Sequence, residues 1–160
     1  MRYVMKQKLF AWGEDFTIKD EKGQDCFFVD GKAFSIGDKL SFEDMRGNEL
    51  ARIEQKLLSF TKTYKIYRGG RQVATVKKKL LTLFRNAFDI EDAAVGDLDA
   101  QGDFLDREYR FTRDGQTIAT VSKRFFSLTD TYGVDIADGE DDVLLLACTV
   151  VIDMCSHDKD

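Results

Sequence analysis

The sequence predicts a single, mainly β domain in which repeated hairpins form a closed antiparallel barrel of about ten to twelve short strands around an apolar C-terminal segment. Three observations predict this fold. A motif that starts at a turn glycine recurs along the chain, and residues 143–152 form an apolar run with no polar face. The 160 residues contain no proline, so nothing interrupts a hydrogen-bonded ladder, and thirteen Phe and five Tyr also favour strands.

The repeat is clearest in residues 47–64 and 115–132, which align without a gap. A third copy starts at Gly70 and a fainter one at Gly23. Two hairpins can resemble each other by chance, but a third copy in the same register favours true repetition. The interval before the last copy is close to twice the others, so we infer a degenerate unit within residues 88–104.

Each copy begins at a predicted tight turn. The turn residues are Lys22-Gly23, Arg46-Gly47-Asn48, Gly69-Gly70 and Asp114-Gly115. Two-residue hairpin turns need positive φ, which Gly adopts without steric cost and Asn or Asp tolerates. We therefore predict each unit as a strand, a two-residue turn and a second strand. End strands are expected near Met5–Phe10 and Val134–Ile136.

The apolar run at residues 143–152 must be buried on all sides or lie in lipid. It is shorter than the ~18 apolar residues that a membrane span needs, so we predict burial and no transmembrane segment. A buried strand is the competing interpretation, because residues 149–152 are β-branched. The acidic residues 140–142 favour a helix N-terminus, and a helix of this length matches a barrel wall ~15 Å high.

We therefore predict a central helix over about residues 141–155 of a domain spanning 1–155, followed by a polar tail at 156–160. Three copies of the repeat support a helix inside the barrel. They carry a small residue at the equivalent position, two before Ile or Val: Ala51, Ala74 and Ala119. With a period of two these alanines share one face with that Ile or Val, and a small side chain there lets a helix approach the wall.

Composition excludes several classes of function. The net charge of −5 argues against a nucleic-acid partner, which favours a basic face. The cysteines, Cys26, Cys148 and Cys155, match no zinc spacing. Residues 1–8 lack the apolar stretch of an export signal. We expect a reduced, cytoplasmic protein without a cofactor.

No catalytic or metal site is predicted. Ser156, His157 and Asp158 are the residue types of a catalytic triad, but they are adjacent in a polar tail, whereas a triad converges from separate elements. The acidic loop within residues 91–103 does not have the spacing of an EF-hand. We therefore expect the protein not to be an enzyme.

The best candidate for ligand binding is the basic cluster of Lys77, Lys78, Lys79 and Arg85. Lysines at one barrel edge would attract an anionic head group, at ~1 kcal/mol per basic residue near an anionic surface. The alternative is a solvated rim. The repeat places Gln55-Lys56 and Lys123-Arg124 at the positions of Lys78-Lys79, which is typical of a recurring surface feature.

Five segments of the chain resemble the LURP-one-related family, within the Tubby C-terminal-like superfamily. They are residues 6–10, 103–109, 118–123, 130–136 and 142–153. The resemblance implies a twelve-stranded barrel around a hydrophobic C-terminal helix, of the short bacterial type. It implies little about activity, although Tubby relatives bind phosphoinositides at membranes and phospholipid scramblases are proposed distant relatives.

Two functional hypotheses follow. The first is a non-enzymatic barrel that binds anionic phospholipid or phosphoinositide head groups and docks peripherally on a membrane. The alternative is a cytoplasmic protein-interaction scaffold. Because the predicted helix fills the barrel centre, we expect any ligand to bind on the outer wall or the rim.

Overall fold

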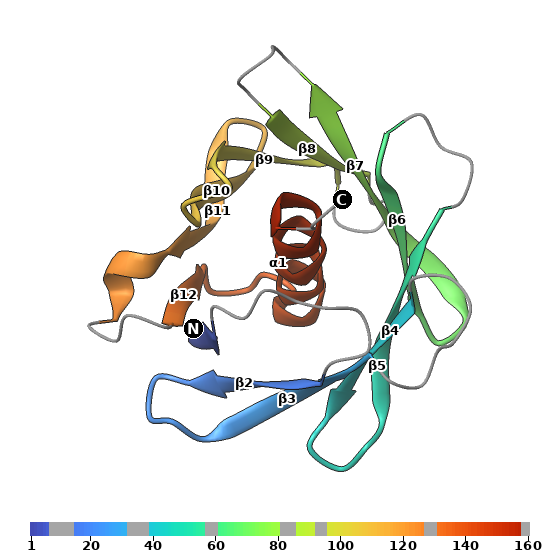
Figure 1. Ribbon diagram of the computed structural model, residues 1–160, viewed down its shortest axis with the longest axis vertical. Coiled ribbons are helices and arrows are strands. Elements are labelled where there is room, and N and C mark those ends of the chain that lie inside the picture. Colours follow the sequence, from blue (N-terminus) through green and yellow to red (C-terminus); the bar gives the residue numbers. More distant parts are fainter. Residues whose placement is uncertain are drawn as a thin grey trace.

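The chain forms a closed barrel of antiparallel strands with one helix in its centre (Figure 1). The computed structural model describes residues 1–6, 15–31, 39–56, 61–80, 86–91, 96–126 and 131–157, with the side chains of all except Leu80, Asn86 and His157. Within these residues there are twelve strands and a single α-helix, α1. The predicted fold class is confirmed.

The strands are β1 (Arg2–Lys6), β2 (Phe16–Asp20), β3 (Asp25–Asp30), β4 (Lys39–Asp44), β5 (Glu49–Gln55), β6 (Thr63–Arg68), β7 (Arg71–Leu80), β8 (Asn86–Glu91), β9 (Leu98–Asp103), β10 (Glu108–Arg113), β11 (Gln116–Ser122) and β12 (Thr131–Ile136). A short 3-10 helix, η1 (Lys123–Phe125), follows β11, and α1 is Asp142–His157. Each strand pairs with its neighbours in sequence, and β12 closes the barrel against β1.

The repeat is visible in the geometry of the hairpins. β2–β3, β4–β5, β6–β7 and β10–β11 each contain a β-bulge at the third residue after the turn glycine. The residues left out of the pairing are Cys26, Leu50, Val73 and Ile118. A bulge increases local strand twist, so its recurrence bends each hairpin in the same way. The inferred degenerate unit corresponds to the β8–β9 hairpin.

Two of the four turns have the predicted two-residue form. Gly69-Gly70 has φ values of 58° and 77°, and Asp114-Gly115 has values of 49° and 79°. The prediction is wrong for the turns at Gly23 and Gly47, where three residues form the loop and only the glycine has positive φ. The reason lies in Asp20 and Asp44, whose carboxylates accept N–H groups two and four residues ahead and so stabilise the longer turn.

The strands at the two ends of the chain pair with each other. β1 lies opposite β12, with Arg2 across from Asp135. The N-terminal strand therefore starts before the predicted Met5–Phe10, and residues 7–10 of that prediction lie outside the described residues. The predicted strand at Val134–Ile136 forms the second half of β12.

The core consists of the inner faces of the strands and α1, which lies inside the barrel (Figure 1). Residues 144–152 of the helix are all at most 2% exposed. The one hydroxyl among them, Thr149 Oγ1, donates a hydrogen bond to the Leu145 carbonyl at 2.8 Å. The helix approaches β5, β7 and β12 most closely, and β5 and β7 carry the buried Ala51 and Ala74.

The helix is longer than predicted at its C-terminal end. It continues to His157 and so includes the first two residues of the predicted tail, while residues 158–160 lie outside the described residues. No helix in the described part of the chain has the length and apolar character needed to cross a membrane.

The barrel has two chemically different ends. We call the end that holds the hairpin turns and the start of α1 the turn end. The opposite end holds the turn that joins β9 to β10, residues 104–107, and the last turns of α1, and we call it the link end. Arg68 and Arg113 contact the start of α1 at the turn end, and Arg107 contacts Asp153 of α1 at the link end.

Candidate functional site

The structure divides the predicted lysine cluster between the two faces of β7. Val76 is buried inside the barrel, and Lys78, two residues further on, continues the same face. Lys77 and Lys79 point outward, where each forms an ion pair with β8. The Lys77 Nζ atom lies 3.2 Å from Glu91 Oε1, and the Lys79 Nζ atom lies 2.6 Å from Asp89 Oδ2.

This separation follows from the period of two in a strand, which places alternate residues on opposite faces. The outward lysines meet carboxylates of the neighbouring strand, and Asp89 raises the pKa of the Lys79 ammonium through a hydrogen bond and its charge. Arg85, the fourth predicted residue, lies outside the described residues. Of the three lysines, Lys78 is the one that lines a cleft at the link end.

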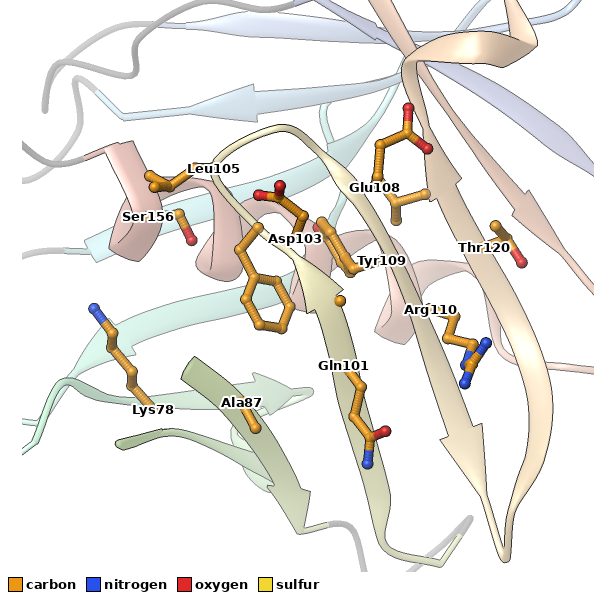
Figure 2. A pocket seen from close by; sticks show the side chains of 13 residues that line it. Lys78, Ala87, Gln101, Asp103, Leu105, Glu108, Tyr109, Arg110, Thr120 and Ser156 are labelled. Atoms are coloured by element: carbon orange, nitrogen blue, oxygen red, sulfur yellow. The ribbon is translucent and has the colours of Figure 1, made fainter. Parts of the chain in front are cut away.

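A cleft of about 990 Å³ opens at the link end, and we call it the link-end cleft. Residues from the inner face line one part of it: Lys78, Phe104, Tyr109, Val121 and Ser156. Residues from the outer face line the other part: Ala87, Gln101, Arg110 and Thr120. Figure 2 shows Lys78 and Ser156 on one side of the cleft and Arg110 and Thr120 on the other, with β9 between them.

Beside the cleft, the pairing between β8 and β9 ends before the strands do. Leu98 lies opposite Ile90 and Ala100 lies opposite Phe88, and the pairing of the two strands ends there. Ala87 still pairs with β7, and Gln101 still pairs with β10, but Ala87 and Gln101 do not pair with each other. We call this unpaired stretch, Asn86–Ala87 opposite Gln101–Gly102, the open seam.

Aromatic rings form the wall of the cleft beside the open seam. The Phe104 ring lies 4.9 Å from the rings of both Phe88 and Tyr109 and is only 5% exposed. Gly102 allows β9 to lie close against β10 here, because a Cβ atom at this position would lie 2.5 Å from the Glu108 carbonyl oxygen. Leu105, the next residue in the same turn, is 71% exposed at the lip.

The electrostatic character of the cleft depends on which charges are already bound. Glu108 accepts hydrogen bonds from Ser122 Oγ at 2.7 Å and the Lys123 N–H at 3.0 Å. Asp103 accepts the Asp106 N–H at 3.0 Å. Within the described part of the chain the cationic groups of Lys78 and Arg110 have no such partner. The cleft thus contains two cationic groups, those of Lys78 and Arg110, and two carboxylates, those of Asp103 and Glu108, which keep their negative charge and part of their acceptor capacity.

A buried ion pair anchors the turn that carries Phe104 and Leu105. Arg107 Nε lies 2.8 Å from Asp153 Oδ1 on α1, and the two side chains are 8% and 2% exposed. The guanidinium also lies 5.3 Å from the centre of the Tyr132 ring. Burial raises the pKa of Asp153 to about 6, although Arg107 opposes the shift. Sequence reasoning missed this pair because its members are distant in the chain.

At the turn end, three contacts fix the start of α1. Arg113 binds Glu140 with two hydrogen bonds of 3.0 and 2.9 Å. Arg68 forms an ion pair with Asp141, and the Tyr3 hydroxyl donates to Asp142. Burial and the bond to Asp142 both raise the pKa of Tyr3. The acidic residues that predicted a helix N-terminus thus bind strands around the barrel.

In the part of the chain that the structure describes, the cysteines and acidic residues form no metal site. Cys148 and Cys155 are buried in α1, and Cys26 is half-buried at the bulge of β3. Among the residues that the structure describes, no group of three or more His, Cys, Asp or Glu side chains is arranged to hold a metal ion.

These features define a class of protein: a twelve-stranded antiparallel barrel closed around its own C-terminal helix, with a cleft at one rim. The family model described as LURP-one-related matches residues 1–153. The chain therefore belongs to the LURP-one-related family, as the sequence resemblance indicated.

Two similar proteins support the assignment. The chain is 36% identical over 157 residues to the uncharacterised protein YxjI of Bacillus subtilis (strain 168), covering 98% of this chain and 94% of that protein. An X-ray structure of a protein from Arabidopsis thaliana is similar with a TM-score of 0.67. It is 18% identical, and the match covers 94% of this chain and 88% of that one. At this identity the likeness establishes the shared fold.

Proposed function

We propose that the protein is a non-enzymatic binding module that docks peripherally on the cytoplasmic face of a membrane and receives the head group of an anionic phospholipid in the link-end cleft. The observation that carries the proposal is the position of Lys78. It lines the cleft and has no ion pair within the described part of the chain, whereas Lys77 and Lys79 are bound to β8 carboxylates.

The surroundings of Lys78 fit an anionic, amphiphilic ligand. Arg110 adds a second cation to the cleft, and the carboxylates of Asp103 and Glu108 already accept hydrogen bonds from the protein. The exposed Leu105 at the lip offers an apolar contact to lipid. A charged group beside apolar surface is the combination that holds peripheral proteins at membranes.

Vesicle flotation tests the proposal with a matched pair of variants. Wild-type protein should float with phosphatidylserine vesicles at physiological salt and remain behind with phosphatidylcholine vesicles. Lys78→Gln should weaken binding about fivefold, the equivalent of ~1 kcal/mol for one basic residue near an anionic surface. Lys77→Gln removes the same charge from the outer face and should change binding less. No flotation, or equal losses in both variants, would contradict the proposal.

A protein-interaction scaffold is the second candidate, and the open seam favours it. The backbone edges of Asn86–Ala87 and Gln101–Gly102 are not paired with each other, and an extended peptide can add to such an edge. Crosslinking in native lysate followed by pull-down tests this role. A stoichiometric partner lost with Gln101→Pro and retained with Gln116→Pro would support it.

A further inference from the structure

We infer that the link end carries a second anion-binding site on the outer face of the wall, formed by Gln101, Arg110 and Thr120, so that docking engages two anionic head groups. We call these three residues the donor row. The inference rests on the proposed function for the membrane as the source of the anions. It goes further by assigning a site separate from Lys78 and two head groups to each protein.

The donor row crosses three neighbouring strands at one level of the wall. Gln101 of β9 lies opposite Arg110 of β10, and Arg110 lies opposite Thr120 of β11. All three side chains line the outer part of the link-end cleft (Figure 2). Neighbouring strands are about 4.8 Å apart, so an amide, a guanidinium and a hydroxyl group stand side by side. These donors suit the oxygens of a phosphate or carboxylate group, and the guanidinium adds a full positive charge.

The strands beside Arg110 leave its charge without an ion pair. On β7, the outward-facing Lys77 and Lys79 each pair with a carboxylate of β8. The residues opposite Arg110 on both neighbouring strands are uncharged. Each oxygen of Glu108, which shares its strand and face, accepts a hydrogen bond from the protein, and Asp103 accepts a backbone N–H of its own turn. Arg110 is therefore a cation flanked by further donors.

The donor row and Lys78 lie on opposite faces of the barrel wall. Lys78 continues the inner face of the buried Val76. Arg110 alternates with the buried Tyr109 and Phe111 and so belongs to the outer face. The paired strands β9 and β10 form the wall here, and Figure 2 shows β9 between the two cations. A single head group cannot contact both cations through this wall, so each cation binds an anion of its own.

Two separate sites predict how docking depends on the amount of anionic lipid. For weak binding, the bound fraction rises in proportion to the lipid fraction with one site and with its square with two sites. Doubling the phosphatidylserine fraction of phosphatidylcholine vesicles should therefore raise the apparent affinity of the wild type about fourfold, and that of Arg110→Gln about twofold. Lys77→Gln removes an equal charge outside both sites and should keep the fourfold dependence. A fourfold dependence in Arg110→Gln would overturn the inference.

A titration with sodium phosphate tests the second site without a membrane. In two-dimensional NMR spectra, the amide signals of Gln101 and Thr120 should shift as phosphate is added to the wild type. The same shifts should persist in Lys78→Gln and disappear in Arg110→Gln, whose other signals report that the variant is folded. Wild-type signals that do not move, or shifts that are lost in Lys78→Gln, would overturn the second site.

The two proposals fail separately. Phosphate binding at the donor row by a protein that floats with no anionic vesicle supports the second site, assigns it to a soluble phosphate compound and contradicts membrane docking. Flotation that depends on Lys78, with a twofold dependence on lipid fraction in the wild type and no shift at Gln101, supports docking through one head group and overturns the second site.

Discussion

The two ends of the barrel differ in whether their charged side chains have partners within the protein. At the turn end, Glu140, Asp141 and Asp142 at the start of α1 each bind a partner on a different strand. At the link end, Lys78 and Arg110 have no such partner in the described part of the chain, and the pairing between β8 and β9 ends before the strands do. The turn end thus fixes the helix within the barrel, whereas the link end keeps binding capacity available.

The link end has one strong internal contact of its own, and it differs from those at the turn end in burial. The Arg107–Asp153 side chains are 8% and 2% exposed, compared with 26% and 19% for Arg113–Glu140. Breaking a buried pair leaves an uncompensated charge, whereas solvent compensates a partner nearer the surface. The comparison therefore predicts that stability is more sensitive to loss of the link-end pair.

The largest effect is expected midway between the two ends. Val151 is fully buried in α1, and Val151→Asp places an unpaired charge in the core. The cost of several kcal/mol is comparable with the whole stability of a domain, so the variant should not fold. Circular dichroism and one-dimensional NMR measure this, with the exposed Gln116→Asp as control. A Val151→Asp variant that melts like wild type would contradict a helix packed on all sides.

The next largest effect concerns the link-end pair. Asp153→Ala should lower the free energy of unfolding by about 3 kcal/mol, because it leaves Arg107 buried without its carboxylate. Urea unfolding measures the change. The double variant Arg107→Met/Asp153→Ala removes both charges and should be more stable than Asp153→Ala alone. A double variant less stable than the single one would show that the pair is not the source of the loss.

The same aspartate should make stability depend on pH. Its folded-state pKa of about 6 lies above the ordinary value of 3.8, so between these values the folded protein binds more protons than the unfolded chain. Stability therefore rises as pH falls, by about 1 kcal/mol from pH 7 to pH 5. Comparison with Asp153→Asn at both pH values isolates this contribution. If the variant shows the same pH dependence as wild type, Asp153 does not cause it.

The smallest effect is expected at the turn end. Glu140→Gln keeps the size of the side chain but removes the charge that binds Arg113. For a partly exposed pair, the free energy of unfolding should fall by less than about 1 kcal/mol. Thermal unfolding of Glu140→Gln and Asp153→Ala under the same conditions compares the loss of stability at the two ends. A loss equal to that of Asp153→Ala would remove the distinction between them.

The parts of the fold that were predicted from sequence are those encoded locally. A turn glycine, the alternation around it and an all-round apolar run lie within short windows, and they specify the hairpins and α1. The division of Lys77 from Lys78 followed from the same period of two. It was missed because the three lysines were treated as one cluster without regard to the strand's faces.

The candidate site depends on relationships that no short window contains. Arg107 and Asp153 meet only after the barrel closes around the helix. The open seam arises where β8 and β9 stop pairing, within the unit whose sequence departs most from the repeat. Phe104 and Gly102 have no counterpart pattern in the other copies. These features depend on the register of strand pairing, which is set by tertiary packing and not by a short stretch of sequence.

The closure of β1 on β12, with α1 inside, also sets the order in which the molecule can be made. On the ribosome the helix that forms the centre is synthesised after every strand around it. The apolar inner faces of the earlier hairpins therefore stay exposed to solvent until the helix has been made. Transiently exposed apolar surface promotes aggregation. For the nascent chain, the core can therefore be completed only after the last strand has been made.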